Sequence, residues 1–205
     1  MKNVLLVFGV LGLSACASQT VNYSLPSSGK VETEKTVAQD LDTTWSTIVS
    51  NISKSFFVIN TIEKDSRIIN VSFSSNNPEE YIDCGTATST VNGQTTYLNV
   101  AQSSTYPTVY QQGIYQYVGR SVKTTSLEGR FNVFVEKLSP EKTKISANAR
   151  YIFSGQIQRF TNQNQMYENN SGKVTFQSTQ AGTSEGVTCS SLGKLEKAIL
   201  EAAVK

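Results

Sequence analysis

Three acidic residues, Glu79, Glu80 and Asp83, lie close together in the chain and are the carboxylates best placed to do chemistry. Paired carboxylates can act as acid and base in glycoside hydrolysis, or they can bind calcium. Consecutive residues of a strand point to opposite faces, so only Glu80 and a neighbour could converge on one site. The sequence therefore favours a simpler interpretation, in which these residues form a solvated loop that leads into a strand.

Histidine, the commonest general base, does not occur in this chain of 205 residues. Its absence removes the usual Ser–His and Cys–His pairs of covalent catalysis. The P-loop and G-x-G-x-x-G motifs of nucleotide-binding proteins are missing too. A serine–lysine pair stays open as an alternative, but we expect a protein that is not an enzyme and that holds no cofactor or metal ion.

The first 15 residues have the layout of a secretory signal peptide. A positive charge on Lys2 precedes an unbroken run of apolar residues and glycine from Val4 to Leu13. This run is too short to cross a hydrocarbon core, which needs about 20 residues. A charged start, a short apolar run and small residues before a cleavage site are typical of a leader that is removed.

The leader ends in Leu13-Ser14-Ala15-Cys16, which resembles the lipobox of bacterial lipoproteins at all four positions. The resemblance implies that the Cys16 thiol carries a diacylglycerol and that its amine is acylated after cleavage, for example with palmitate. Several acyl chains together anchor a protein firmly in a membrane. Because Ala17 rather than aspartate follows Cys16, the resemblance to sorted lipoproteins of Gram-negative envelopes implies the outer membrane. The alternative is a soluble secreted protein with a chance cysteine at the cleavage site.

Two cysteines, Cys84 and Cys189, remain once Cys16 is assigned to lipid. An even pair in an oxidising compartment predicts a disulfide. It would close a loop of about a hundred residues, a constraint worth roughly 4 to 5 kcal/mol in the chain-entropy model, and would pin the C-terminal helix to a central strand. The alternatives are two free thiols or a metal site, but two cysteines without histidine make a poor ligand set.

Charge and length limit the remaining possibilities. The chain has 18 Lys and Arg against 16 Asp and Glu, and the basic residues are scattered, so we expect no nucleic-acid partner. Residues 16–35 are expected to be the lipidated Cys16 and a flexible tether, because they are polar, contain Pro26 and Gly29, and show no apolar period. Residues 36–205 are long enough for a single domain with its own core.

Two helices are predicted, one at each end of this domain. Asp42 is the expected N-cap of the first helix, and the second helix is expected from about Ser190. The apolar residues that recur at helical spacing in the first helix are Trp45, Ile48, Val49, Ile52 and Phe56.

Period-2 alternation and turn signals predict β-strands between the two helices. One hairpin is expected to turn at Asp65-Ser66, and another at Asn92-Gly93, a dipeptide that favours a type I′ turn. The expected strands are 57–62, 69–73, 81–89, 95–100, 126–138, 144–153 and 173–178, and the stretches without a strand pattern are 101–124 and 156–172.

These elements predict the α+β class, with an antiparallel β-sheet wrapped on an N-terminal helix and a long C-terminal helix. The arrangement resembles the helix-grip domains of small envelope lipoproteins, of which the BamC type is best known. The resemblance covers residues 37–204 and implies this fold and an envelope setting. Proteins of that type usually have two such domains, whereas this chain has room for one, so we take nothing further from it. The segments that carry the resemblance are "DTTWSTIVSNI" leading into "FFVINTIEKDSRIINVSF", the central "YIDCG", and the terminal "CSSLGKLEKAILEAA".

Helix-grip folds often hold apolar ligands between the sheet and the long helix, which makes this groove a candidate binding site. The lining would be Phe131, Val133, Val135, Leu195 and Ile199. An ordinary core needs the same residues, and this is the favoured interpretation.

Four tyrosines among glutamines, Tyr106, Tyr110, Tyr115 and Tyr117, are the candidate interaction residues. Tyrosine combines a rigid apolar ring with a hydrogen-bonding tip, which favours it at protein interfaces. The rings could also stack on the sugars of a glycan. In the structural alternative, Tyr115 and Tyr117 continue a strand, while Tyr106 and Tyr110 cover a sheet edge.

The sequence thus predicts an outer-membrane-anchored lipoprotein that acts as a non-enzymatic accessory or docking subunit of a cell-envelope assembly. The alternative function is a carrier or sensor of an apolar ligand in the helix-grip groove. The expected partners are the membrane, through the lipid on Cys16, and an envelope protein, with an apolar ligand or a glycan as alternatives.

Overall fold

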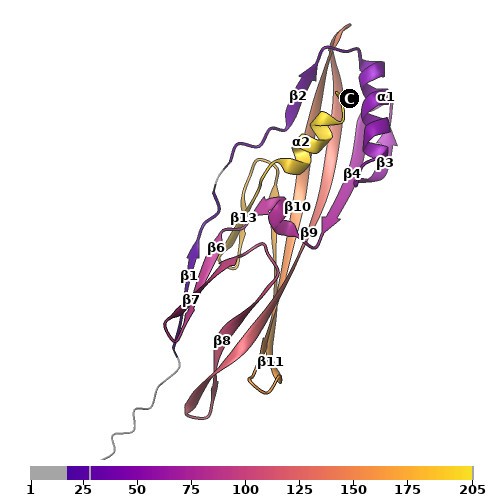
Figure 1. Cartoon of the computed structure of the whole chain (residues 1–205). Helices are drawn as coiled ribbons and strands as arrows, with labels where there is room; N and C mark the ends of the chain where they lie inside the picture. The colour runs from indigo at the N-terminus through magenta and orange to yellow at the C-terminus, as the bar shows by residue number, and fades with distance from the viewer. Residues whose placement is uncertain (1–17, 28, 205) are drawn as a thin grey trace, which may run out of the picture.

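The computed structural model describes residues 18–27 and 29–204. The molecule is elongated and mostly β, with both helices near one end and the start of β1 (Gln19–Ser24) toward the other (Figure 1). Its longest element, β9 (Tyr115–Ser139), has 25 residues. At about 3.3 Å per residue such a strand spans roughly 80 Å, so β9 runs along most of the molecule.

The remaining elements are strands of 2 to 19 residues, two α-helices and one 3-10 turn within the described part of the chain. In chain order they are β2 (Glu34–Val37), α1 (Leu41–Ser53), β3 (Val58–Glu63), β4 (Ile68–Ser75), η1 (Pro78–Glu80), β5 (Ile82–Asp83), β6 (Thr86–Val91), β7 (Gln94–Asn99), β8 (Ser104–Gln112), β10 (Lys142–Phe160), β11 (Met166–Gln177), β12 (Gly182–Ser184), β13 (Val187–Ser191) and α2 (Lys194–Glu201).

The main sheet is antiparallel, in the order β11-β10-β9-β4-β3, with β2 added to β10 and β8 added to β9. Strand β9 changes its neighbour along its length: residues 115–123 pair with β8, and residues 127–134 pair with β4. Strand β10 likewise exchanges β11 for β2. The sheet is therefore two sheets in series that share the continuous β9–β10 hairpin.

Two small sheets, β1-β6-β7 and β12-β13-β5, lie beside the main sheet. In the first, the β6–β7 hairpin turns at Asn92 and Gly93, which have φ angles of 50° and 82°. Both residues are left-handed, as a type I′ turn requires, so the predicted hairpin at this dipeptide is confirmed.

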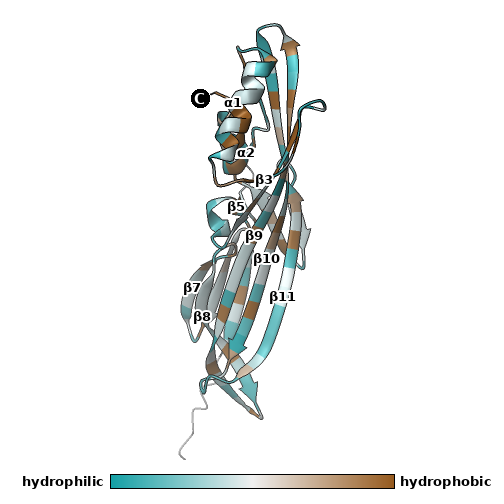
Figure 2. Cartoon of the chain, turned by 90° about the vertical axis from the view of Figure 1, so that its right-hand side faces the viewer, coloured by the Kyte–Doolittle hydropathy of each residue, from teal (hydrophilic) through white to brown (hydrophobic). Residues whose placement is uncertain are grey.

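We call the part of the main sheet that contains β4, residues 127–135 of β9 and residues 145–153 of β10 the upper sheet. Both helices pack on the same face of this upper sheet and leave its other face open (Figure 2). Helix α1 contributes Trp45, Ile48 and Ile52 to the core, and α2 contributes Leu195 and Ile199. The sheet contributes the odd-numbered side chains of β9, from Leu127 to Val135, and those of β10, from Ile145 to Phe153. The core therefore occupies the upper half of the molecule.

Helix α1 confirms the first predicted helix but begins earlier. Its N-cap is Asp40, whose carboxylate accepts a hydrogen bond from the Thr43 backbone N–H over 3.0 Å, so the expected cap at Asp42 is wrong. The helix ends at Ser53, and Phe56 lies outside it with 58% of its surface exposed.

The predicted fold class, α+β with an antiparallel sheet wrapped on an N-terminal helix and a long C-terminal helix, is wrong. The described chain is mostly strand, and its two helices have 13 and 8 residues. Helix α2 is short because the chain stays extended up to Ser191 in β13. This strand pairs with β12 and with β5. Gly193, with φ 73°, then makes the turn that lets the helix begin at Lys194.

The stretch expected to be a flexible tether, residues 16–35, contains a paired strand instead. Strand β1 pairs along its whole length with β6, and β2 starts at Glu34 and pairs with β10. A strand without an apolar period is stabilised here by a partner about 65 positions away in the sequence, so local composition does not reveal it. Cys16 itself lies outside the described residues.

The expected disulfide between Cys84 and Cys189 is present, with the sulfur atoms 2.01 Å apart. Both residues are fully buried. Cys189 lies in β13 rather than in the C-terminal helix, so the bridge joins the β12–β13 hairpin to the segment between β5 and β6.

Candidate functional site

The lower part of the main sheet forms a four-stranded projection that we call the finger. It consists of β8, residues 115–123 of β9, residues 154–160 of β10 and residues 166–173 of β11. The stretches 101–124 and 156–172, which were expected to lack strands, supply most of it. The finger ends in two turns, at residues 113–114 and 161–165.

The four candidate tyrosines all belong to the finger, but they do not share one environment. Tyr115 and Tyr117 are 62% and 37% exposed, whereas Tyr110 is only 8% exposed. Tyr106 is half-buried in β8. Tyr110 is therefore too deeply buried to contact a partner, whereas Tyr115 and Tyr117 are accessible.

Tyr110 is the centre of an aromatic cluster that joins β8, β9 and β11. Its ring stacks on Tyr117 with the ring centroids 5.6 Å apart, and it lies 5.4 Å from the ring of Tyr167. Its hydroxyl donates to the side-chain oxygen of Asn162 over 2.9 Å. Gly119 leaves room for the ring, because a Cβ there would lie 3.2 Å from Tyr110 Cδ1. Tyr110 therefore has a structural role.

The finger end exposes several apolar side chains that were not among the candidates. The exposed fractions are 86% for Ile114, 54% for Met166, 42% for Tyr167 and 39% for Val118. The sequence does carry a signal for this end: no charged residue occurs between Asp83 and Arg120, or between Arg159 and Glu168. Such long uncharged stretches set this end apart from the rest of the chain.

A second exposed surface is the helix-free face of the upper sheet, where even-numbered residues of β4, β9 and β10 form rows across the strands. From the upper end the rows are Ile68-Phe134-Ser146, Asn70-Asn132-Asn148, Ser72-Arg130-Arg150 and Ser74-Glu128-Ile152.

Amide hydrogen bonds order the asparagine row of this face. Asn60 of β3 donates to Asn70 over 2.9 Å, and Asn70 donates to Asn132 over 2.7 Å. In the next row, Arg130 and Arg150 are direct cross-strand neighbours and both are exposed. Within the described residues neither arginine makes an ion pair, although Glu128 lies in the adjacent row. Opposed like charges destabilise a sheet, so this pair is a local cost.

The groove expected between sheet and helix is filled by its own lining. Phe131, Val133, Val135 and Ile199 are fully buried, and Leu195 is 1% exposed. These side chains form the core in which Phe131 meets Tyr151 edge to face, with the centroids 5.7 Å apart. The favoured interpretation of these residues as core is confirmed.

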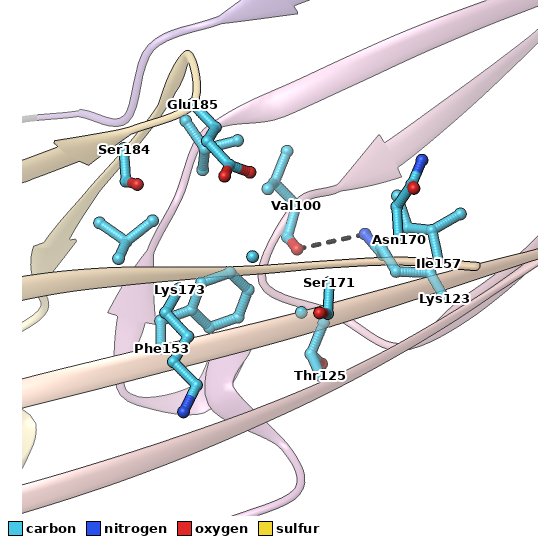
Figure 3. Close-up of a pocket in the computed structure, with 14 residues that line it drawn as sticks. Val100, Lys123, Thr125, Phe153, Ile157, Asn170, Ser171, Lys173, Ser184 and Glu185 are labelled. Carbon is cyan, nitrogen blue, oxygen red and sulfur yellow. Dashed lines mark hydrogen bonds between the residues drawn. The ribbon is translucent and has the colours of Figure 1, made fainter.

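A smaller pocket of about 180 Å³ lies where the finger meets the β12–β13 hairpin (Figure 3). Its walls include Val100, Lys123, Phe153, Ile157 and Glu185. Sites for drug-sized ligands usually measure about 300 to 1,000 Å³, so this pocket has room only for a small group.

Lys123 is the buried charge of this pocket, only 8% exposed. Its amine donates to the backbone oxygens of Asn99 over 2.7 Å and Val100 over 3.2 Å. Burial lowers the pKa of Lys123 to about 8, and the charge of Glu79 opposes this in part. Because its amine bonds to the connection between β7 and β8, Lys123 ties that connection to β9. These two hydrogen bonds involve no serine of the described chain, so they do not form a serine–lysine pair.

Two residues of the pocket wall, Ser184 and Glu185, belong to a further sequence motif that was not among the candidates. Residues 182–186, Gly-Thr-Ser-Glu-Gly, match the G-x-S-x-G pattern of serine hydrolases. In those enzymes the serine lies on a turn between a strand and a helix, and a histidine activates it. Ser184 lies instead in a hairpin between β12 and β13, in a chain without histidine. The match carries no catalytic assignment.

The acidic residues 79, 80 and 83 do not converge. Glu79 and Glu80 belong to η1, whereas the Asp83 carboxylate accepts hydrogen bonds from Ser27 and from the backbone N–H of Gly85. Among the described residues no three Cys, Asp or Glu side chains gather as metal ligands would. Asp83 therefore fixes the chain locally.

Comparison with known proteins does not assign the chain to a group. No protein family, curated protein or solved structure matches it. In the part of the chain that the structure describes, neither helix is long and apolar enough to cross a bilayer.

Proposed function

We propose that this protein is a lipoprotein anchored in the outer membrane through lipid on Cys16, and that it serves there as a non-enzymatic accessory or docking subunit of a cell-envelope assembly. The support for the anchor is the leader followed by Leu13-Ser14-Ala15-Cys16. The BamC-type helix-grip likeness no longer contributes, because the fold differs.

The observation that carries the docking role is the helix-free face with its opposed arginines. Arg130 and Arg150 lie side by side on adjacent strands without an acidic partner in the described chain. A local arrangement that costs stability without a compensating contact is expected at functional sites. An acidic surface on a partner protein would neutralise both guanidinium groups and form paired hydrogen bonds with them.

The apolar and amide rows beside the arginines suit the same role. Phe134 is 41% and Ile68 is 39% exposed, and they are cross-strand neighbours at the upper end of the face. Arginine and aromatic residues are enriched in the centres of protein interfaces. The asparagine row, in which Asn70 donates to Asn132, lies between these two groups.

The docking role is tested by co-purification with a charge-reversed face. The protein is extracted gently from its own membranes and analysed by native mass spectrometry. We expect a partner at fixed stoichiometry with the parent chain, and its loss with the double variant Arg130→Glu/Arg150→Glu. The matched control is Lys142→Glu, a charge reversal at the exposed first residue of β10. Equal recovery with all three chains, or a parent that is only a monomer, would contradict the docking role.

The anchor is tested separately with Cys16→Ala. Removing the thiol that would carry the lipid is expected to abolish incorporation of labelled palmitate and to release the protein from the membrane fraction. A Cys16→Ala chain that stays in the outer membrane to the same extent as the parent would contradict the lipid anchor.

A further inference from the structure

The start of the described chain lies beside the finger, close to its end. Gln19 accepts hydrogen bonds at its side-chain oxygen from the Val109 backbone N–H over 3.0 Å and from the Thr108 hydroxyl over 3.2 Å. Ser18 donates its backbone N–H to Asn92 in the β6–β7 turn. The chain therefore enters the fold level with Thr108 and Val109 of β8.

From Val109, β8 runs on to Gln112, and the turn at Gly113 and Ile114 closes the hairpin. At about 3.3 Å per residue, Ile114 lies roughly 15 Å beyond the level at which the chain enters. Figure 1 shows both finger turns at the end of the molecule away from the helices, past the start of β1. The finger end thus projects farther in this direction than the chain entry.

Ser18 follows Cys16 by two positions in the chain. Even fully extended, they span about 7 Å. If Cys16 carries lipid in a bilayer, the entry point of the chain stays within that distance of the anchored residue. The turn at Gly113 and Ile114, which projects about twice as far as this, then reaches the surface of the same bilayer.

The chemistry of the finger end suits the boundary between lipid headgroups and acyl chains. Ile114 presents an apolar side chain at the turn between β8 and β9, and Tyr115 beside it presents a ring with a polar tip. Tyrosines are favoured at this boundary because one end of the ring is apolar and the other hydrogen-bonds to water or headgroups. A charged side chain would be costly there, and the described segments between Asp83 and Arg120 and between Arg159 and Glu168 have none.

Charged side chains begin six residues behind Ile114, where Arg120 pairs with Phe160. Arg120 stacks over the ring of Phe160 at 4.3 Å, and its Nε donates to Asn164 over 3.3 Å. Arg159 forms an ion pair with Glu168, so the three charges leave one net positive charge at this level.

We propose that the end of the finger, comprising Ile114 and Tyr115, is a second membrane contact that inserts into the interface of the bilayer in which Cys16 is anchored. This inference rests on the proposed lipid anchor. The covalent lipid holds the chain at the bilayer, and the finger end fixes its orientation. With both contacts made, the long axis of β9 points away from the membrane, and the helix-free face is held clear of the headgroups.

The test is lipid quenching of a fluorophore at the two ends of the β9 strand. The full lipidated protein is reconstituted in vesicles of phosphatidylethanolamine and phosphatidylglycerol with bromine on the acyl chains. One variant carries an environment-sensitive dye at Ile114→Cys, and the matched control carries it at Glu141→Cys in the exposed turn between β9 and β10. We expect a blue shift and loss of intensity at position 114, and no change at position 141.

The outcomes separate this inference from the anchor itself. Vesicles that float with the protein while both dyes stay unquenched would overturn the finger contact and leave the anchor intact. Protein that does not float would overturn the anchor. A dye at position 114 that is shielded from aqueous iodide but not quenched by brominated lipid would show that a second copy covers the finger end, which would also overturn the contact.

Discussion

The hydroxyl of Tyr151 in β10 donates a hydrogen bond to Oε1 of Glu196 in α2 over 2.8 Å, and both side chains are fully buried. The Ser191 hydroxyl lies 3.2 Å from each oxygen of the same carboxylate. Burial and, after it, the charge of Glu196 hold the pKa of Tyr151 well above its ordinary value, so the hydroxyl keeps its proton. Since a buried carboxylate is tolerated only when its oxygens are hydrogen-bonded, this network is what holds the short helix α2 on the sheet.

Replacing Tyr151 with phenylalanine should destabilise the protein more than an ordinary loss of one hydroxyl. The variant keeps the ring in the core but deprives the buried Glu196 carboxylate of a donor. Hydrogen bonds to charged groups contribute about 1.5 to 3 kcal/mol, so we expect the free energy of unfolding to fall by roughly 2 kcal/mol. Urea denaturation measures it.

A double-mutant cycle gives the control for this prediction. Tyr151→Phe combined with Glu196→Leu removes both partners, and the combined loss should be smaller than the sum of the single losses by at least about 1 kcal/mol. Additive losses would show that the two side chains do not stabilise each other.

Lys123 should make the stability of the protein depend on pH under mildly alkaline conditions. Its pKa is about 8 in the folded chain, against 10.5 for an ordinary lysine, because burial disfavours the charged form. Between these values the unfolded chain holds the proton and the folded chain does not, so stability rises with pH. The cost of burying the charge is fully present below pH 8.

The measurement compares the parent with Lys123→Met at several pH values. Between about pH 7 and pH 9.5, the free energy of unfolding of the parent should gain roughly 2 kcal/mol relative to the variant. Staying below pH 10 avoids the ionisation of tyrosines in the unfolded chain. Parallel curves for the two proteins would mean that Lys123 keeps its ordinary pKa.

Tyr23 should hold β1 in place, because its hydroxyl lies between two segments of the disulfide region. It donates to the backbone oxygen of Cys84 over 3.0 Å and accepts from the Thr188 N–H over 3.0 Å. Tyr23→Phe removes both hydrogen bonds at a cost of about 1 kcal/mol, which corresponds to a roughly fivefold rise in amide exchange from local opening. The rise should be confined to residues 19–24. Tyr97→Phe, at a position 77% exposed, is the control and should leave exchange unchanged.

Where one side of an element is buried by near neighbours, the sequence was sufficient to predict it. The helical spacing of Trp45, Ile48 and Ile52 predicted α1, because the helix face that these residues share is buried. Alternation in residues 126–138 gave the upper half of β9 for the same reason. Asn92-Gly93 gave its turn because few other residues adopt two successive left-handed conformations.

The finger could not be predicted in this way because it carries no continuous apolar face. Its strands are defined by pairing with one another, as in the register of Val109 with Val118 and of Ile157 with Asn170. Strand β1 depends likewise on β6, which lies far away in the sequence. Without a buried face, the alternation of apolar and polar residues that marks a strand is missing. Whether such a segment forms a strand then depends only on its tertiary partner.

The candidate sites also divide into those that the sequence predicts and those that only the fold reveals. The Cys84–Cys189 bridge follows from counting cysteines and is confirmed. The pair Arg130 and Arg150 can be recognised only from the register of β9 against β10, since the two residues are 20 positions apart. Ile114 is placed at the far end of the finger only by the pairing of β8 with β9.

The difference between Tyr110 and Tyr115 gives the sharpest test of the finger. Tyr110 contacts Tyr117, Tyr167 and Asn162, so Tyr110→Ala should cost about 3 kcal/mol, the usual loss for a buried aromatic residue. Tyr110→Phe loses only the hydroxyl and should cost about 1 kcal/mol. Tyr115 is 62% exposed, and Tyr115→Ala should change the free energy of unfolding by less than about 0.5 kcal/mol.

Because the finger can open without the rest of the sheet, this comparison needs a local measurement as well as a global one. Amide exchange in β8 and in residues 115–123 of β9 should rise strongly in Tyr110→Ala and stay at the parent level in Tyr115→Ala. Equal exchange in the two variants would mean that the aromatic cluster does not hold the finger together. In that case Tyr110 would return to the set of residues free to contact a partner.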